Sequence, residues 1–177
     1  MLCGALALSM CIPMSMTAMR AEATSRVDEI LAGMTIDQKI GQMIMPDFRM
    51  WQAEGEDAQS DMTVLNDEVA EIIDQYDFGG VILFAENVKE TEQTLKLTTD
   101  MQNAAITNEA GNGDIPLLIT IDQEGGSVYR RGSGTALPGN MAIGATNSEE
   151  DARLAGEIIG RELSALGINV NFAPVFD

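Results

Sequence analysis

Histidine is absent from this chain of 177 residues. Its absence removes the commonest general base and metal ligand, so a Ser-His-Asp triad and an imidazole-based zinc site are both excluded within the chain. Cysteine is nearly absent as well, since Cys3 and Cys11 are the only two. Both lie close to the amino terminus, so the rest of the chain has no disulfide framework.

Basic residues are scarce: 10 Lys and Arg stand against 28 Asp and Glu, for a formal net charge of −18 at pH 7. Phosphate binding needs a basic surface, so this balance argues against nucleic acid and against anionic membranes as partners. The acidic run over residues 54–57 lacks the alternating ligands and the distal Glu of a calcium loop. Gly132 and Gly134 belong to no phosphate-binding glycine motif. We therefore predict no metal and no cofactor.

Long apolar runs are also missing. The apolar stretch near the amino terminus covers about a dozen residues, which is too short to span a bilayer. Residues 1–23 resemble a secretory signal without its basic start, and Ala21-Glu22-Ala23 resembles a small-x-small cleavage site. We expect a signal or extension over 1–23, a folded region over 24–177, and export to the cell envelope or the medium. An extension without an export role, on a cytoplasmic protein, is the alternative.

The rest of the chain alternates between strand-like and helix-like patterns. Such alternation favours an α/β fold with parallel strands and right-handed crossovers. Thr35 to Gln38 has the form of a capping box that opens a short helix. Residues 49–62 lack periodicity and are predicted to be a loop that Trp51 anchors, with stacking of Trp51 on a ligand as the alternative. The predicted strands are 41–48, 81–84, 115–121 and 168–175, and the helices between them are 64–76, 91–105 and 148–165.

The most informative stretch is residues 115–134, IPLLITIDQEGGSVYRRGSG. Its apolar half suits a strand buried on both faces. At the end of that strand the sequence changes to Asp122, a glycine pair follows, and Arg130 lies eight residues after Asp122. Parallel α/β folds bind ligands at the carboxyl ends of their strands, and a glycine turn allows the chain to double back. We therefore predict that Asp122 and Arg130 face one ligand site.

Two blocks of the sequence carry a family resemblance: IDQEGGSVYRRGSGTALPGNMAIGAT and GINVNFAPVFD. They resemble glycoside hydrolase family 3, and within it the β-N-acetylglucosaminidase branch, over about Val27 to Asp177. The resemblance implies an α/β fold that is the first half of a (β/α)₈ TIM barrel, with about four parallel strands. Because a complete barrel takes about 250 residues, we expect this chain to be a fragment that is marginally folded and inactive alone.

The resemblance implies a retaining glycosidase that releases terminal non-reducing β-linked N-acetylglucosamine from a carbohydrate, such as peptidoglycan or chitin fragments. In this branch the nucleophile is an Asp on a late strand, and the acid/base is a His on a loop after the fifth strand. No catalytic residue is therefore expected before Asp177. The alternatives are a β-glucosidase or β-xylosidase of the same family, and a non-catalytic sugar-binding remnant.

The resemblance also implies roles for two residues. Asp122 would accept hydrogen bonds from hydroxyls of the terminal sugar, and Arg130 would donate to the same sugar and pair with Asp122. A strand-end cap is the alternative role for Asp122, and a surface position is the alternative for Arg130. Glu124 and Asp177 are weaker candidates for substrate contacts. Ser127 stands where the branch commonly has Arg, so no contact is predicted from that position.

Overall fold

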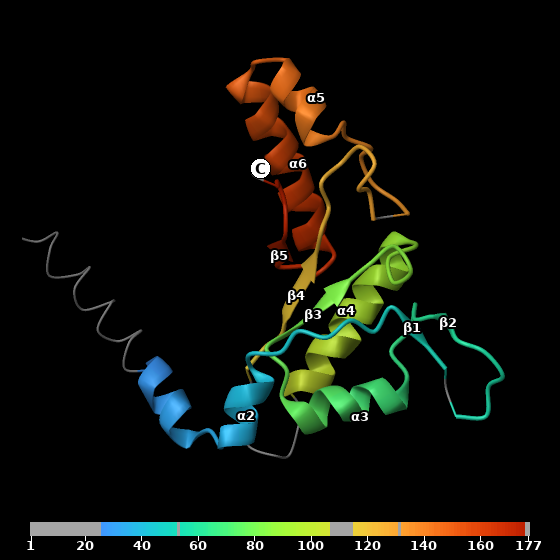
Figure 1. Ribbon diagram of the computed structural model, residues 1–177, viewed down its shortest axis with the longest axis vertical. Helices are drawn as coiled ribbons and strands as arrows, with labels where there is room; N and C mark the ends of the chain where they lie inside the picture. Colours follow the sequence, from blue (N-terminus) through green and yellow to red (C-terminus); the bar gives the residue numbers. More distant parts are fainter. Residues whose placement is uncertain (1–25, 53, 107–114, 131, 176–177) are drawn as a thin grey trace, which may run out of the picture.

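The centre of the fold is a parallel sheet. The computed structural model describes residues 26–52, 54–106, 115–130 and 132–175. Val81 lies opposite Ile119, and Thr120 lies opposite Val170, in the register of the ladder. Because the strands are parallel, their carboxyl ends meet at one edge, near the loop that leads to α5 (Figure 1). The sheet contains, in spatial order, β3 (Gly80–Leu83), β4 (Leu118–Ile121) and β5 (Val170–Asn171).

The strand predicted over residues 41–48 forms only in part. Its first residue instead ends the helix α2 (Ile36–Gly41). Farther on, Asp47 forms a single parallel bridge with Ile82, and the Ile82 amide donates to the Pro46 carbonyl at 3.1 Å. Proline has no N–H to donate to a ladder, which limits the pairing at this position. The segment therefore lies beside β3 as a short edge of the sheet.

The strand predicted over residues 168–175 is also shorter than expected. The amides of Asn169 and Phe172 donate to the carbonyls of Ile119 and Ile121 at 3.0 and 2.8 Å, so hydrogen bonding extends one residue to each side of β5. Pro174 follows without a donor and ends the pairing.

The helix starts predicted at Thr35 and Ser148 agree with the structure. Thr35 and Gln38 form a complete capping box at the start of α2. The Ser148 hydroxyl accepts from the Asp151 amide at 3.1 Å and begins the helix predicted over 148–165. Asn66 caps its helix in the same way, so that helix begins three residues later than predicted. Residues 26–33 are helical too, and the named helices after α2 are α3 (Asp67–Tyr76), α4 (Thr91–Ile106), α5 (Asn140–Ala145) and α6 (Glu149–Ala165).

The sequence suggested an irregular loop over residues 49–62, but this segment contains a short hairpin. β1 (Met50–Trp51) pairs with β2 (Ser60–Asp61) in a short antiparallel ladder. The Trp51 indole donates to a Glu68 carboxylate oxygen at 2.6 Å and packs edge-on against Phe48, with ring centroids 6.2 Å apart. Trp51 therefore anchors this hairpin to α3. The strands were not predicted because two residues are too few to show an alternation of apolar and polar side chains.

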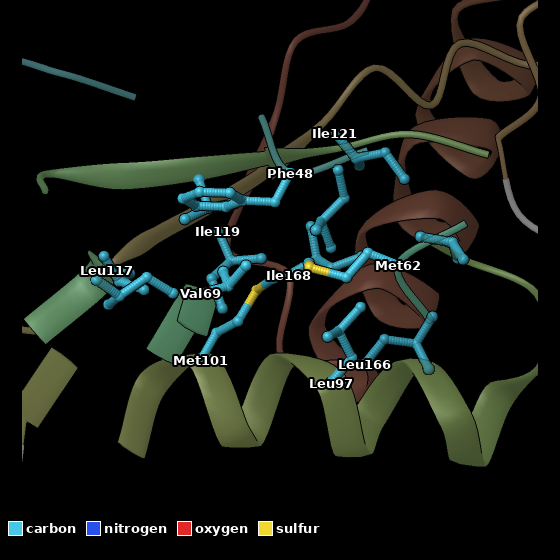
Figure 2. Close-up of a cluster of buried hydrophobic side chains, with 14 of the residues drawn as sticks. Phe48, Met62, Val69, Leu97, Met101, Leu117, Ile119, Ile121, Leu166 and Ile168 are labelled. Carbon is cyan, nitrogen blue, oxygen red and sulfur yellow. The ribbon is translucent and has the colours of Figure 1, made fainter. Parts of the chain in front are cut away.

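The main core lies between the sheet and the helices α3 and α4. In Figure 2, Leu97 and Met101 rise from α4 toward Phe48 and Ile119. Each fully buried aliphatic side chain contributes about 1.5–3 kcal/mol. This packing fixes the carboxyl ends of β3 and β4, on which the site depends. The fully buried residues also include Val69, Ile73, Val81, Leu83, Leu117 and Ile121.

None of the described helices is long and apolar enough to cross a bilayer. The predicted signal over residues 1–23 lies outside the described residues and stays a prediction, as does the boundary at residue 24.

Candidate functional site

Asp122 lies where the sequence placed it, directly after β4 at the carboxyl edge of the sheet. The Arg130 guanidinium donates through Nη2 to Oδ2 of Asp122 at 2.7 Å, so the expected pairing is present. The Arg130 side chain is 31% exposed, and the Asp122 side chain is 23% exposed. A charge-assisted bond of this length is roughly twice as strong as a neutral one, and partial burial reduces its screening by salt.

The ion pair leaves two polar atoms unused. Oδ1 of Asp122 and Nε of Arg130 are buried but have no hydrogen-bond partner among the described residues. An unsatisfied buried polar group costs about 1–3 kcal/mol. A ligand hydroxyl that bonded to either atom would remove that cost, so the pair is suited to a polyhydroxylated ligand.

The glycine pair makes the turn that returns Arg130 to Asp122. Gly125 and Gly126 have φ values of 85° and 59°, in the left-handed region that glycine adopts without strain. The Glu124 amide donates to the Val128 carbonyl at 3.1 Å across this turn. A Cβ on Gly125 would lie 2.6 Å from the Pro138 carbonyl oxygen, so packing as well as conformation requires glycine there.

Arg49 and Phe84 also belong to this edge, and neither was predicted from the sequence. Phe84 directly follows β3 as Asp122 follows β4. The guanidinium carbons of Arg49 and Arg130 lie 3.6 and 5.6 Å from the Phe84 ring centroid. The sequence contained a signal for Phe84. Phe84 stands at the end of the apolar run of its strand, as Asp122 stands directly after the apolar run of β4.

Gln123 and Asn171 were missed too. Gln123 is buried, and its side chain accepts from the Arg130 amide at 2.9 Å. Asn171, on β5, bonds to the main chain of Gln123. No local pattern indicates a contact between residues so far apart in the sequence.

Glu124 is not brought to the ion pair. Among the described residues, no hydrogen bond or ion pair joins its carboxylate to Asp122 or Arg130. Glu124 instead lines a cleft of about 750 Å³ between this loop, α5 and α6. Ala152 on α6 is exposed along the same cleft. The other weaker candidate, Asp177, lies outside the described residues.

The described residues contain no group of three or more acidic or cysteine side chains that could hold a metal ion.

Residues 35–177 match the model of the glycosyl hydrolase family 3 N terminal domain. The chain belongs to glycoside hydrolase family 3. It is 45% identical over 153 residues to beta-hexosaminidase A of Pseudoalteromonas piscicida, covering 81% of this chain and 25% of that one. It is also 42% identical over 74 residues to a beta-N-acetylglucosaminidase/beta-glucosidase of Cellulomonas fimi, covering 42% of this chain and 13% of that one.

Solved structures of the family have the same arrangement. A family 3 beta-N-acetylglucosaminidase from Paenibacillus sp. superposes with a TM-score of 0.66 at 41% identity, covering 80% of this chain and 24% of that one. NagZ from Neisseria gonorrhoeae, solved in complex with N-trifluoroacetyl-D-glucosamine, gives 0.57 at 27% identity, covering 76% and 36%.

These comparisons confirm the predicted α/β class, with the parallel strands of the first half of a (β/α)₈ TIM barrel. The strands are β3, β4, β5 and the edge segment at Asp47. The chain spans about a quarter of the length of the first relatives it matches.

Proposed function

We propose that this chain supplies the sugar-gripping part of a glycoside hydrolase that releases terminal non-reducing β-linked N-acetylglucosamine. The observation that carries the proposal is the Asp122–Arg130 pair at the carboxyl edge of the sheet, with one unpartnered oxygen and one unpartnered N–H nitrogen. The named activities of the hexosaminidase relatives support this sugar.

The pair has complementary roles toward a sugar. The Asp122 carboxylate has only acceptors, so it can grip neighbouring hydroxyls that donate to it. Arg130 has only donors, so it binds hydroxyl oxygens. Because Arg130 also holds Asp122 through Nη2, the carboxylate is already oriented when the sugar arrives. The site would recognise the hydroxyl pattern of the terminal sugar, and the N-acetyl group would be recognised elsewhere.

The chemistry itself would use groups beyond these 177 residues. In a retaining hydrolase a carboxylate attacks the anomeric carbon while an acid protonates the leaving oxygen, and water then cleaves the glycosyl-enzyme. The contribution of Asp122 and Arg130 is to hold the sugar ring so that its anomeric carbon meets that carboxylate.

The test is the sugar preference of the full-length gene product. We expect p-nitrophenol release from the β-N-acetylglucosaminide to exceed that from the β-glucoside and the β-xyloside. A preference for the β-glucoside would favour the second candidate, a β-glucosidase, which the double name of the Cellulomonas fimi relative supports. Binding of N-acetylglucosamine without turnover of any of the three would identify a non-catalytic sugar-binding protein.

We also propose that the protein is exported, from the signal-like pattern of residues 1–23. A carboxyl-terminally tagged protein should appear in the envelope or the medium with its amino terminus close after Ala23. A cytoplasmic protein that retains residues 1–23 would contradict this proposal.

A further inference from the structure

We propose that Gln123 and Asn171 are positioning residues for the pair formed by Asp122 and Arg130. Asn171 fixes the main chain of Gln123, and Gln123 in turn holds Arg130 opposite Asp122. This inference rests on the proposed function of Asp122 and Arg130, and it concerns two residues that need not touch the sugar.

Gln123 connects both members of the pair. It follows Asp122 in the chain, and its side-chain carbonyl accepts from the Arg130 amide at 2.9 Å. Only 2% of Gln123 is exposed, so its amide group does not exchange this partner for solvent. The position of Arg130 relative to Asp122 is therefore set by one buried side chain, in addition to the ion pair itself.

Asn171 holds Gln123 from the neighbouring strand. Its Oδ1 accepts from the Gln123 amide at 2.9 Å, and its Nδ2 donates to the Gln123 carbonyl at 3.0 Å. Asn171 is the last β5 residue in register with β4, opposite Ile121. Its side-chain amide thus continues the hydrogen bonding beyond the last ladder pair, where the main chain of the loop would otherwise be free to turn.

Asn169, the residue directly before β5, provides a matched comparison. Its Oδ1 accepts from the Ile119 amide at 2.9 Å, and its Nδ2 donates to the Leu117 carbonyl at 3.1 Å. Asn169 therefore also accepts one hydrogen bond from the chain of β4 and donates one to it, but toward the end of β4 that lies away from the ion pair. Loss of either asparagine removes two hydrogen bonds between the strands, and only Asn171 is connected to Arg130.

The first experiment compares Asn171→Ala with Asn169→Ala in the full-length protein. We expect similar decreases in Tm, because each variant loses two bonds of the same kind. Only Asn171→Ala should raise KM for p-nitrophenyl β-N-acetylglucosaminide, roughly tenfold with little change in kcat, because Arg130 loses its fixed position. For a protein that binds without turnover, the Kd of N-acetylglucosamine replaces KM. Equal effects of the two variants on KM or Kd would overturn the inference.

A double-mutant cycle tests whether Asn171 acts through Arg130. Arg130→Ala should weaken sugar binding less in the Asn171→Ala background than in the native protein, because the arginine is already displaced. Strictly additive losses would contradict the inference. If Asn171→Ala fails to fold, Asn171→Asp, which keeps the acceptor and removes the donor, takes its place in the cycle. Gln123→Met, which removes the acceptor for Arg130, should raise KM in the same way.

The inference and the proposed function fail in different ways. An unchanged KM in Asp122→Asn would contradict the proposed sugar grip. A raised KM in Asp122→Asn, together with equal effects of Asn171→Ala and Asn169→Ala, would contradict only the positioning roles.

Discussion

The guanidinium carbon of Arg49 lies 3.6 Å from the ring centroid of Phe84, and Arg130 approaches the same ring at 5.6 Å. Arg49 follows the edge segment, Phe84 follows β3, and Arg130 pairs with the residue that follows β4. The aromatic ring therefore links three neighbouring positions at the carboxyl edge of the sheet, beside the proposed sugar site.

Phe84→Leu tests this link. The substitution keeps an apolar side chain and removes the π face, so it should cost about 0.5–2 kcal/mol of cation–π attraction. We expect a several-fold rise in KM for the β-N-acetylglucosaminide, because Arg130 loses one of its supports. Arg49→Met in a parallel assay shows how much of the effect comes from Arg49. An unchanged KM in Phe84→Leu would show that the ring does not support Arg130.

Gly132 should not tolerate a side chain. Its amide donates to the Val88 carbonyl at 3.0 Å, and an added Cβ would lie only 2.0 Å from the Lys89 carbonyl oxygen. Gly132→Ala should therefore push the Arg130 loop away from the segment at Val88 and Lys89, at a cost of about 1–3 kcal/mol. Gly160→Ala is the control, since a Cβ there meets open space within α6 and should stabilise by up to about 1 kcal/mol. A thermal melt of each variant measures both effects, and a Gly132→Ala variant with native Tm would contradict the close packing.

The hairpin anchor should respond to acid. The hydrogen bond from Trp51, and then that from the Glu54 amide, hold the pKa of Glu68 below its ordinary value of 4.5. Because the folded pKa is lowered, the stabilisation is fully present above pH 4.5 and is lost as pH falls through the folded pKa. The emission of Trp51, taken as the difference from a Trp51→Phe variant, should therefore change below pH 4.5. Glu68→Gln should abolish this transition, and a transition that persists in Glu68→Gln would assign it to another group.

The parts of the structure that the sequence predicted are those that depend on neighbours in the chain. Thr35 and Ser148 cap helices because their partners lie three residues away. The contact between Asp122 and Arg130 could be predicted because only eight residues separate them and a glycine pair between them makes the turn.

The parts that the sequence missed depend on distant contacts. Gln123 and Asn171 are separated by 48 residues, and no periodicity marks a side-chain amide that bonds to a neighbouring strand. The hairpin at Trp51 was missed because two-residue strands carry no alternation. The strand at Asp47 was overestimated because Pro46 removes a donor from an otherwise apolar run.

The measurement that tests the account most directly is the kinetics of Asp122→Asn beside Glu124→Gln in the full-length protein. Both substitutions remove one negative charge at nearly constant shape, from residues two positions apart. Charge-assisted hydrogen bonds contribute about 1.5–3 kcal/mol each, so Asp122→Asn should lower kcat/KM for the β-N-acetylglucosaminide by about a hundredfold. Glu124→Gln should leave it nearly unchanged. Native kcat/KM in Asp122→Asn, or equal losses in the two variants, would contradict the sugar grip.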